Sequence, residues 1–134
     1  MAKGEVLMAL AEITVVQPNQ DVSDGTLIEA VREALVVGLR VPVDDPTILV
    51  SRMAPSQAVL PGGLEAMILV KITMFVGRSL DTRESLHALV AQELKEVGVP
   101  VENVRTVFVE TPVSNWGVDG SPQDSSSVGF DIAI

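Results

Sequence analysis

One pattern of apolar residues occurs twice in this chain, and this repeat limits what the chain can fold into. The clearer copy covers residues 68–110, where one apolar run ends at Gly77 and a second follows at 104–109. Between the two runs, apolar residues recur at steps of three and four: Leu86, Leu89, Val90, Leu94 and Val97. That period is typical of an amphipathic helix. A strand, a helix and a strand with short links form a βαβ unit, so the two strands should lie parallel.

Local signals mark the ends of this helix. Asp81, followed three residues later by Glu84, fits a capping box at its start. Gly98 followed by Pro100 fits its stop.

The second copy lies earlier in the chain. Ile13-Thr14 recurs 59 residues later as Ile72-Thr73, and Val41-Pro42-Val43 recurs 58 residues later as Val99-Pro100-Val101. The first unit is therefore a strand over about 6–16, a helix over about 23–38 and a strand over about 47–53. Two such units suggest a pseudo-twofold domain. We predict a single domain over 1–134, with repeat 1 at about 6–53, repeat 2 at about 67–110 and a C-terminal loop and strand at 111–134.

The first strand of each unit alternates in the same way. One face is apolar in both strands and suits the helices, whereas the other face is mixed. If these strands are neighbours, Glu12 and Lys71 can pair across them. The predicted fold class is α+β, a four-stranded mixed sheet with both helices on one face. The half-apolar second face then needs a cover, and we expect another subunit to supply it.

Composition excludes several classes of protein. The 134 residues carry a net charge of −9, so no basic field is present to hold nucleic acid or an anionic membrane. Cysteine is absent and His87 is the single histidine, so we expect no disulfide, no metal site and no cofactor. No apolar run reaches about 18 residues and no signal peptide is recognisable. We expect a cytoplasmic protein.

Three features of the sequence together resemble the tautomerase superfamily. They are the two βαβ units, the Gly77-Arg78-Ser79 turn after the third strand, and the segment from Glu110 to Asn115-Trp116. Length and the Asn-Trp pair are most similar to the malonate semialdehyde decarboxylase-like branch. The resemblance covers about residues 8–132 and implies trimers of double units. It implies chemistry by an N-terminal proline, whose amine has a lowered pKa and acts as general base or acid on small carbonyl acids. It also implies that arginines hold the substrate carboxylate and that an acidic residue orients water or substrate.

This sequence departs from the family pattern at the proline. Without gaps, the family's Met-Pro falls on Met8-Ala9, so the nitrogen of residue 9 is an amide. The acidic position falls on Asp45, and the arginine pair falls on Val76 and Arg78, so one arginine remains. The resemblance therefore implies catalytic roles for Arg78 and Asp45. It places Arg78, Trp116, Asn115 and Ala9 at the substrate.

Each of these residues also has a structural interpretation. Arg78 can pair with Asp81 or a helix end, Asp45 can be part of an ordinary turn, Trp116 can fill a subunit interface, and Asn115 can satisfy loop backbone. Other contacts are expected elsewhere: Glu110 paired with Arg52, His87 on the helix surface, packing by Ala58, Val59 and Leu60 in the connector, and a short strand at 128–134.

Three hypotheses follow. The chain is a tautomerase-like isomerase of small carbonyl acids, or a related decarboxylase or hydratase. Alternatively, it is a trimeric binding or structural protein that kept the fold and lost the amine. The third hypothesis is that residues 1–8 are an artefact and Ala9 replaces the catalytic proline.

Overall fold

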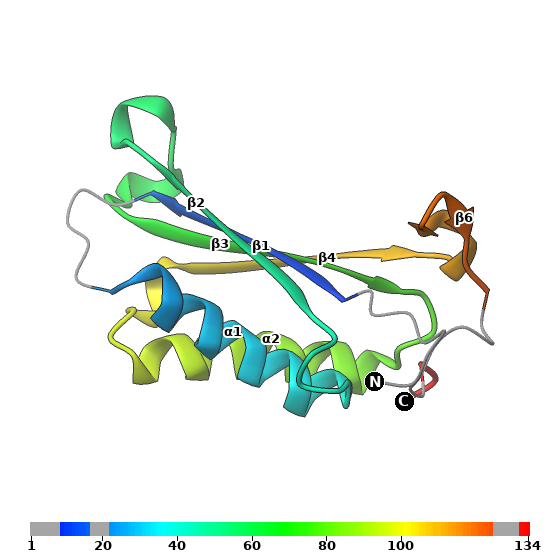
Figure 1. Cartoon of the computed structure of the whole chain (residues 1–134). Coiled ribbons are helices and arrows are strands. Elements are labelled where there is room, and N and C mark those ends of the chain that lie inside the picture. The colour runs from blue at the N-terminus through cyan, green and yellow to red at the C-terminus, as the bar shows by residue number, and fades with distance from the viewer. Residues whose placement is uncertain (1–8, 17–21, 125–131) are drawn as a thin grey trace.

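Two strand–helix–strand units follow one another along the chain (Figure 1). The computed structural model describes residues 9–16, 22–124 and 132–134. The units consist of β1 (Leu10–Val16), α1 (Asp24–Leu39), β2 (Thr47–Met53), β3 (Met67–Phe75), α2 (Leu80–Glu96) and β4 (Val104–Thr111). A small ribbon follows, made of β5 (Gly117–Val118) and β6 (Ser121–Pro122). The predicted elements of both units are present; the expected start of the first strand at residue 6 lies outside the described residues.

The four long strands form one sheet in the order β2-β1-β3-β4. β2 runs parallel to β1 and β4 runs parallel to β3, whereas β1 and β3 are antiparallel. Each parallel pair belongs to one βαβ unit, and the antiparallel contact joins the units. The predicted α+β fold with a mixed sheet is therefore confirmed.

Both helices cover the same face of the sheet (Figure 1). The core lies between these layers and contains the alternate residues of β1 and β3 that the sequence pattern assigned to the helix side: Ala11, Ile13, Val15, Ile68, Val70, Ile72 and Met74. The helices approach closely at Gly38, where an added Cβ would meet Leu86 Cδ1 at 3.0 Å. A larger residue there would require the side chains of Leu86 and Leu89 to shift.

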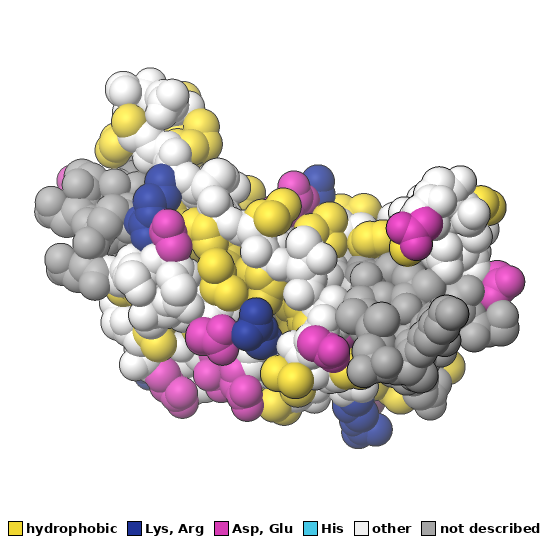
Figure 2. All heavy atoms as spheres, in the orientation of Figure 1, with side chains coloured by type: hydrophobic (Ala, Val, Ile, Leu, Met, Phe, Trp, Pro, Cys, Tyr) yellow, Lys and Arg dark blue, Asp and Glu magenta, His cyan; other side chains and the backbone are white. Residues whose placement is uncertain are grey.

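The opposite face of the sheet, which we call the outer face, is mixed and partly exposed. One row across the four strands consists of Leu49, Glu12, Lys71 and Val107. Lys71 Nζ lies 3.9 Å from a Glu12 carboxylate oxygen, which confirms the predicted cross-strand pair. Leu49 is 54% exposed and Val107 is 44% exposed at the ends of this row. Figure 2 shows hydrophobic side chains on the surface between two protrusions, which are the β2–β3 connector and the β5–β6 ribbon.

The two helices begin with the same cap. Ser23 Oγ accepts from the backbone N–H of Thr26 at 3.2 Å, and Ser79 Oγ accepts from that of Thr82 at 3.1 Å. The capping box predicted at Asp81 is therefore wrong. The helix starts two residues earlier, because the Ser79 hydroxyl already satisfies one of the exposed N–H groups of the first turn.

Glu110 and Arg52, which were predicted to pair with each other, each form an ion pair with a different residue. Glu110 lies 3.6 Å from Arg83, and Arg52 lies 2.7 Å from Asp24. The predicted pair of Glu110 with Arg52 is wrong because β2 and β4 are the two outer strands of the sheet, so these residues lie at opposite edges.

The connector and the C-terminal residues also depart from expectation. Of the three connector residues predicted to pack, Ala58 and Leu60 are half-buried, whereas Val59 is 99% exposed and does not pack within this chain. Of the strand expected at 128–134, residues 128–131 lie outside the described part. Residues 132–134 form no strand there. Instead the backbone oxygen of Ile134 accepts from Ser79 N and from Thr82 Oγ1, both at 2.8 Å, at the start of α2.

Candidate functional site

The direction of the strands brings three of the candidate residues to one end of the sheet. β1 and β2 are parallel, so Ala9 and Asp45, which precede them, lie at the same end. β3 is antiparallel to β1, so its carboxyl end lies there too, and Arg78 follows it. Residues 36 and 33 apart in the chain are thereby placed around one end of the fold.

Asp45 is bound directly to Ala9, the position at which the resemblance to the tautomerase superfamily implies a proline. The backbone N–H of Ala9 donates to Asp45 Oδ2 at 3.1 Å. Asp45 is 1% exposed, and its own N–H donates to the Pro42 carbonyl at 3.0 Å, which fixes the turn before β2. Because Met8 precedes Ala9, this nitrogen is a peptide amide and acts here as a donor, without the basicity of an amine.

Arg78 contacts the end of a helix. It is 5% exposed, and Nη1 donates to the carbonyl of Leu39 at 2.8 Å. Leu39 ends α1, and the next residue, Arg40, adopts a left-handed conformation with φ 54°. A guanidinium at the carboxyl end of a helix satisfies one of its last carbonyls and complements the negative end of the helix dipole. The structural interpretation of Arg78 is therefore realised, in its helix-end form.

Trp116 and Asn115 lie beyond the end of β4: Asn115 ends the short 3₁₀ helix Val113–Asn115, and Trp116 follows it. The Trp116 ring packs edge-to-face on Phe75, with centroids 5.9 Å apart, and its Nε1 donates to Thr111 Oγ1 at 2.8 Å. The side chain of Asn115 is exposed. Trp116 thus packs within its own chain, in a small cluster separate from the main core.

Sequence reasoning missed three residues at this end. Leu39 supplies the carbonyl that Arg78 binds, Phe75 is the buried centre of the Trp116 cluster, and Ile132 joins that cluster and lies against Gly77. A signal existed for Phe75, since it is the large aromatic residue on an otherwise mixed strand face. No sequence signal marked the Leu39 carbonyl, because a backbone acceptor leaves no trace in the side-chain pattern.

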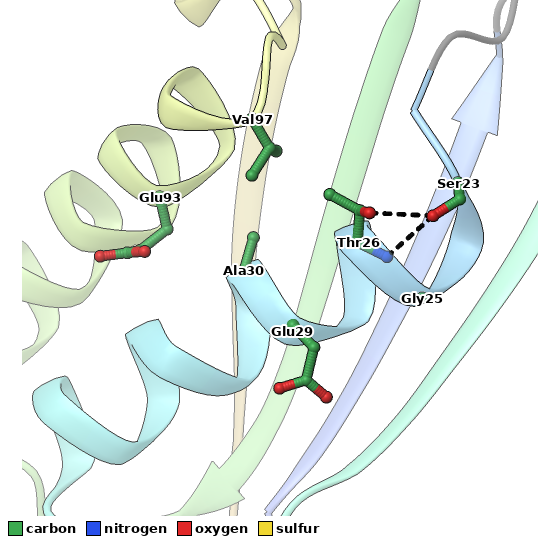
Figure 3. A pocket seen from close by; sticks show the side chains of 7 residues that line it. All are labelled: Ser23, Gly25, Thr26, Glu29, Ala30, Glu93 and Val97. Atoms are coloured by element: carbon green, nitrogen blue, oxygen red, sulfur yellow. Dashed lines mark hydrogen bonds between the residues drawn. The ribbon is translucent and has the colours of Figure 1, made fainter.

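An open groove of about 680 Å³ lies at the opposite end of the helical layer (Figure 3). It runs between the start of α1 and the end of α2. Its hydroxyls, Ser23 and Thr26, bond to each other at 2.9 Å, and Glu29 is paired with Arg32 at 2.8 Å. Partial burial, together with the neighbouring Glu96 and Glu33 carboxylates, raises the pKa of Glu93. These acidic side chains make the groove a poor place for a carboxylate ligand.

His87 is anchored to β4. Its ring stacks on Phe108, with centroids 3.9 Å apart and planes inclined by 16°, and it hydrogen-bonds the Thr106 hydroxyl. It is exposed, as predicted for the helix surface. The described residues contain no group of three or more His, Cys, Asp or Glu side chains that could hold a metal ion. None of the described helices is long and apolar enough to cross a membrane.

Known proteins resemble this chain in sequence and in fold. A probable tautomerase of Ralstonia nicotianae (strain ATCC BAA-1114 / GMI1000) is 31% identical over 61 residues, which is 45% of this chain and 87% of that protein. A wild-type fused 4-OT, solved as a symmetric trimer, superposes with a TM-score of 0.76 at 20% identity, covering 90% of this chain and 99% of that chain. A malonate semialdehyde decarboxylase inhibited by 3-bromopropiolate gives a TM-score of 0.70 at 22% identity, covering 81% and 87%.

At these identities the solved structures establish the fold alone. The family follows from sequence, because residues 45–119 match the family described as tautomerase enzyme. That segment starts at the buried Asp45, includes Arg78 and ends just after Trp116. The chain therefore belongs to the tautomerase family.

Proposed function

We propose that this protein binds a small carbonyl carboxylic acid at the end of the sheet where Ala9, Asp45 and Arg78 lie. The class of reaction that fits is keto–enol isomerisation, or a related decarboxylation or hydration. The observation that supports this most is the hydrogen bond between Ala9 N–H and Asp45 Oδ2, 3.1 Å long and buried. It pairs the family's acidic position with the family's proline position.

The position of Arg78 supports binding of an anion. Arg78 follows the carboxyl end of β3 and directly precedes Ser79, which caps α2. Ligands of α/β folds commonly lie at strand ends, and the first turn of a helix favours negative charge. A guanidinium can hold a carboxylate in two hydrogen bonds. In this proposal Arg78 holds the acid and Asp45 orients water or the carbonyl end of the substrate.

Turnover in this proposal is slow. Proton abstraction needs a base with a pKa near the working pH, and an amide nitrogen is not such a base. The Ala9 nitrogen is a peptide amide, whose lone pair is delocalised into the neighbouring carbonyl, so it cannot accept a proton at neutral pH. Arg78 can still polarise the bound acid, and binding survives where turnover is poor.

Isothermal calorimetry with pyruvate tests the binding site. Arg78→Ala should weaken binding by about 1.5–3 kcal/mol, the worth of a charge-assisted hydrogen bond. Arg83→Ala is the matched control, because Arg83 lies five residues further along the chain, on α2, and pairs with Glu110. Equal binding by the parent and the Arg78 variant would assign Arg78 a structural role alone.

One observation favours a second candidate, a non-catalytic binding or structural protein on the same fold. Arg78 is 5% exposed and already donates to the Leu39 carbonyl, which is what a helix-capping residue does. If pyruvate and related keto acids do not bind the parent protein, this candidate replaces the first.

The proposed assembly is a homotrimer. The outer face leaves Leu49, Val107 and Val109 between 36% and 54% exposed, and apolar patches of this kind mark protein interfaces. The fully exposed Val59 lies on a connector that protrudes on that same side of the sheet (Figure 1). The fused 4-OT that this chain resembles along nearly its whole length was solved as a trimer.

A further inference from the structure

The second βαβ unit contains the counterpart of the Ala9–Asp45 position. The offsets of 59 and 58 residues that relate the two units carry Ala9 to Ile68 and Asp45 to Asn103. The strand registers agree with these offsets, since Leu10 lies opposite Thr47 in the first unit and Leu69 lies opposite Arg105 in the second. Asn103 therefore stands beside Ile68 as Asp45 stands beside Ala9.

The backbone turn is the same in both units. Asp45 N donates to the Pro42 carbonyl at 3.0 Å, and Asn103 N donates to the Pro100 carbonyl at 3.0 Å. The turn thus delivers an acidic side chain in the first unit and a neutral amide in the second.

A cavity of about 240 Å³ lies at this second position. Eight residues line it, among them Met67, Ile68, Val99, Pro100 and Asn103. Ligand pockets for drug-sized molecules are about 300–1,000 Å³, so this one suits a smaller molecule.

The lining determines what class of molecule fits. Of the eight residues, none has a charged side chain, and Asn103 alone has a polar one. An ionised carboxylate entering this cavity would lose hydration without gaining a cation in return. The Asn103 amide both donates and accepts hydrogen bonds, which matches another primary amide in both directions.

We infer that this cavity is a second ligand site, which takes a small uncharged carboxamide with an apolar body. It differs from the first position in the charge of one residue, Asn103 in place of Asp45, and in having no arginine among its lining residues. The inference does not depend on the proposed function of the first unit.

Isobutyramide and isobutyrate test this inference, because they have nearly the same shape and differ in charge. Each is titrated into the full, ¹⁵N-labelled protein, with backbone amide signals followed by NMR. Isobutyramide should produce saturable shifts at Met67, Ile68, Gly98 and Val99, whereas isobutyrate should leave these signals in place. No saturable shift with isobutyramide, or equal shifts with both compounds, would overturn the inference.

Two variants locate the contact. Asn103→Leu should weaken isobutyramide binding about tenfold or more, since the one polar side chain that lines the cavity is lost. Glu102→Gln is the control, because Glu102 is the exposed neighbour of Asn103 and does not line the cavity. Should Asn103→Leu fail to fold, Ala66→Leu narrows the same cavity and should weaken binding as well. Unchanged affinity in the folded variant would rule out this site.

Discussion

Asp45 and Arg78 are the two charged side chains that the described part of the chain buries. Burying an ionised group costs several kcal/mol unless partners compensate it. Ala9 N–H supplies a partner for Asp45, and the Leu39 carbonyl supplies one for Arg78. Both contacts lie at the same end of the sheet, which is where the proposed ligand binds.

Replacing Arg78 should affect stability as well as binding. Arg78→Ala leaves the last carbonyl of α1 without this donor, and the free energy of unfolding should fall by about 1–3 kcal/mol. Urea denaturation followed by circular dichroism measures the change. Arg83→Ala, whose ion pair is partly exposed, should cost less than about 1 kcal/mol. Equal losses of unfolding free energy in the two variants would mean that the contact of Arg78 with the Leu39 carbonyl stabilises the fold no more than an exposed ion pair does.

Glu93 gives a prediction with a defined pH dependence. Its pKa is raised by burial and by Glu96 and Glu33, so the ionised form is disfavoured in the folded state. The folded protein therefore binds this proton more tightly than the unfolded chain, and the associated stability is lost as pH rises above the ordinary value of 4.5.

Glu93→Gln removes the ionisable group, and with it the loss of stability that ionisation of Glu93 causes in the folded protein. The variant should be more stable than the parent at pH 7, by about 0.5 kcal/mol or less because solvent screens the side chain, with the difference vanishing below the ordinary pKa. Thermal melts at pH 4 and pH 7 measure it. A variant less stable than the parent at pH 7 would contradict the assigned cause.

Among the secondary-structure elements, the two helices begin with the same kind of serine cap. The sequence predicted a start of the second helix at Asp81 instead, because Asp81 and Glu84 have the spacing of a capping box. Ser23 and Thr26 in α1 correspond to Ser79 and Thr82 in α2. Asp81 and Glu84 fitted a capping box by spacing alone, which reports residue types and says nothing of which side chain meets which N–H. Aligning the two helices on Ser23 and Ser79 would have favoured Ser79 over Asp81 as the cap of α2.

Both caps should matter by similar amounts. Ser23→Ala and Ser79→Ala should each lower the free energy of unfolding by about 1 kcal/mol, because each leaves an N–H of the first turn without its acceptor. Asp81→Asn is the control and should change stability by a few tenths of a kcal/mol at most. A larger loss for Asp81→Asn than for Ser79→Ala would restore the capping box.

Periodicity predicted the strands and helices well, since hydrophobic burial decides both the period and the packing. The pair of Glu12 with Lys71 was predicted on the condition that the first strands of the two units are neighbours, and the structure meets this condition because β1 and β3 lie side by side, antiparallel. Ion pairs that depend on the order of the strands in the sheet could not be predicted from the sequence. The Glu110–Arg52 pair failed because nothing in the repeat states that β2 and β4 lie at opposite edges. For Arg78, a contact with a helix end was one of the predicted alternatives, but which backbone carbonyl it would bind, that of Leu39, was not predicted.

In the molecule as a whole, the two faces of the sheet are covered to different extents. Helices cover one face of the sheet, while the outer face keeps exposed apolar side chains between two protrusions (Figure 2). A single layer of helices on a four-stranded sheet leaves such a face open, and association of subunits is one way to bury it.

Light scattering at micromolar concentration should therefore report a trimer. Leu49→Lys with Val107→Lys, which places charge at both ends of one outer row, should shift the protein towards monomer. Val37→Lys is the matched control, because Val37 is 53% exposed but lies on α1, on the opposite layer. A monomeric parent protein would refute the trimer, and a control that dissociates equally would locate the interface elsewhere.

We propose that this fold keeps a binding position for a carbonyl acid and lacks the amine that would make it a fast tautomerase. The ketonisation of phenylenolpyruvate, followed spectroscopically, tests both parts of this proposal. The parent protein is compared with a variant that lacks residues 1–8 and carries Ala9→Pro, so that a proline amine stands beside Asp45. The variant should be faster by about 10²–10⁴-fold, the usual contribution of a positioned general base. A parent protein that turns over as fast as the variant would contradict it, because another group would then be supplying the base.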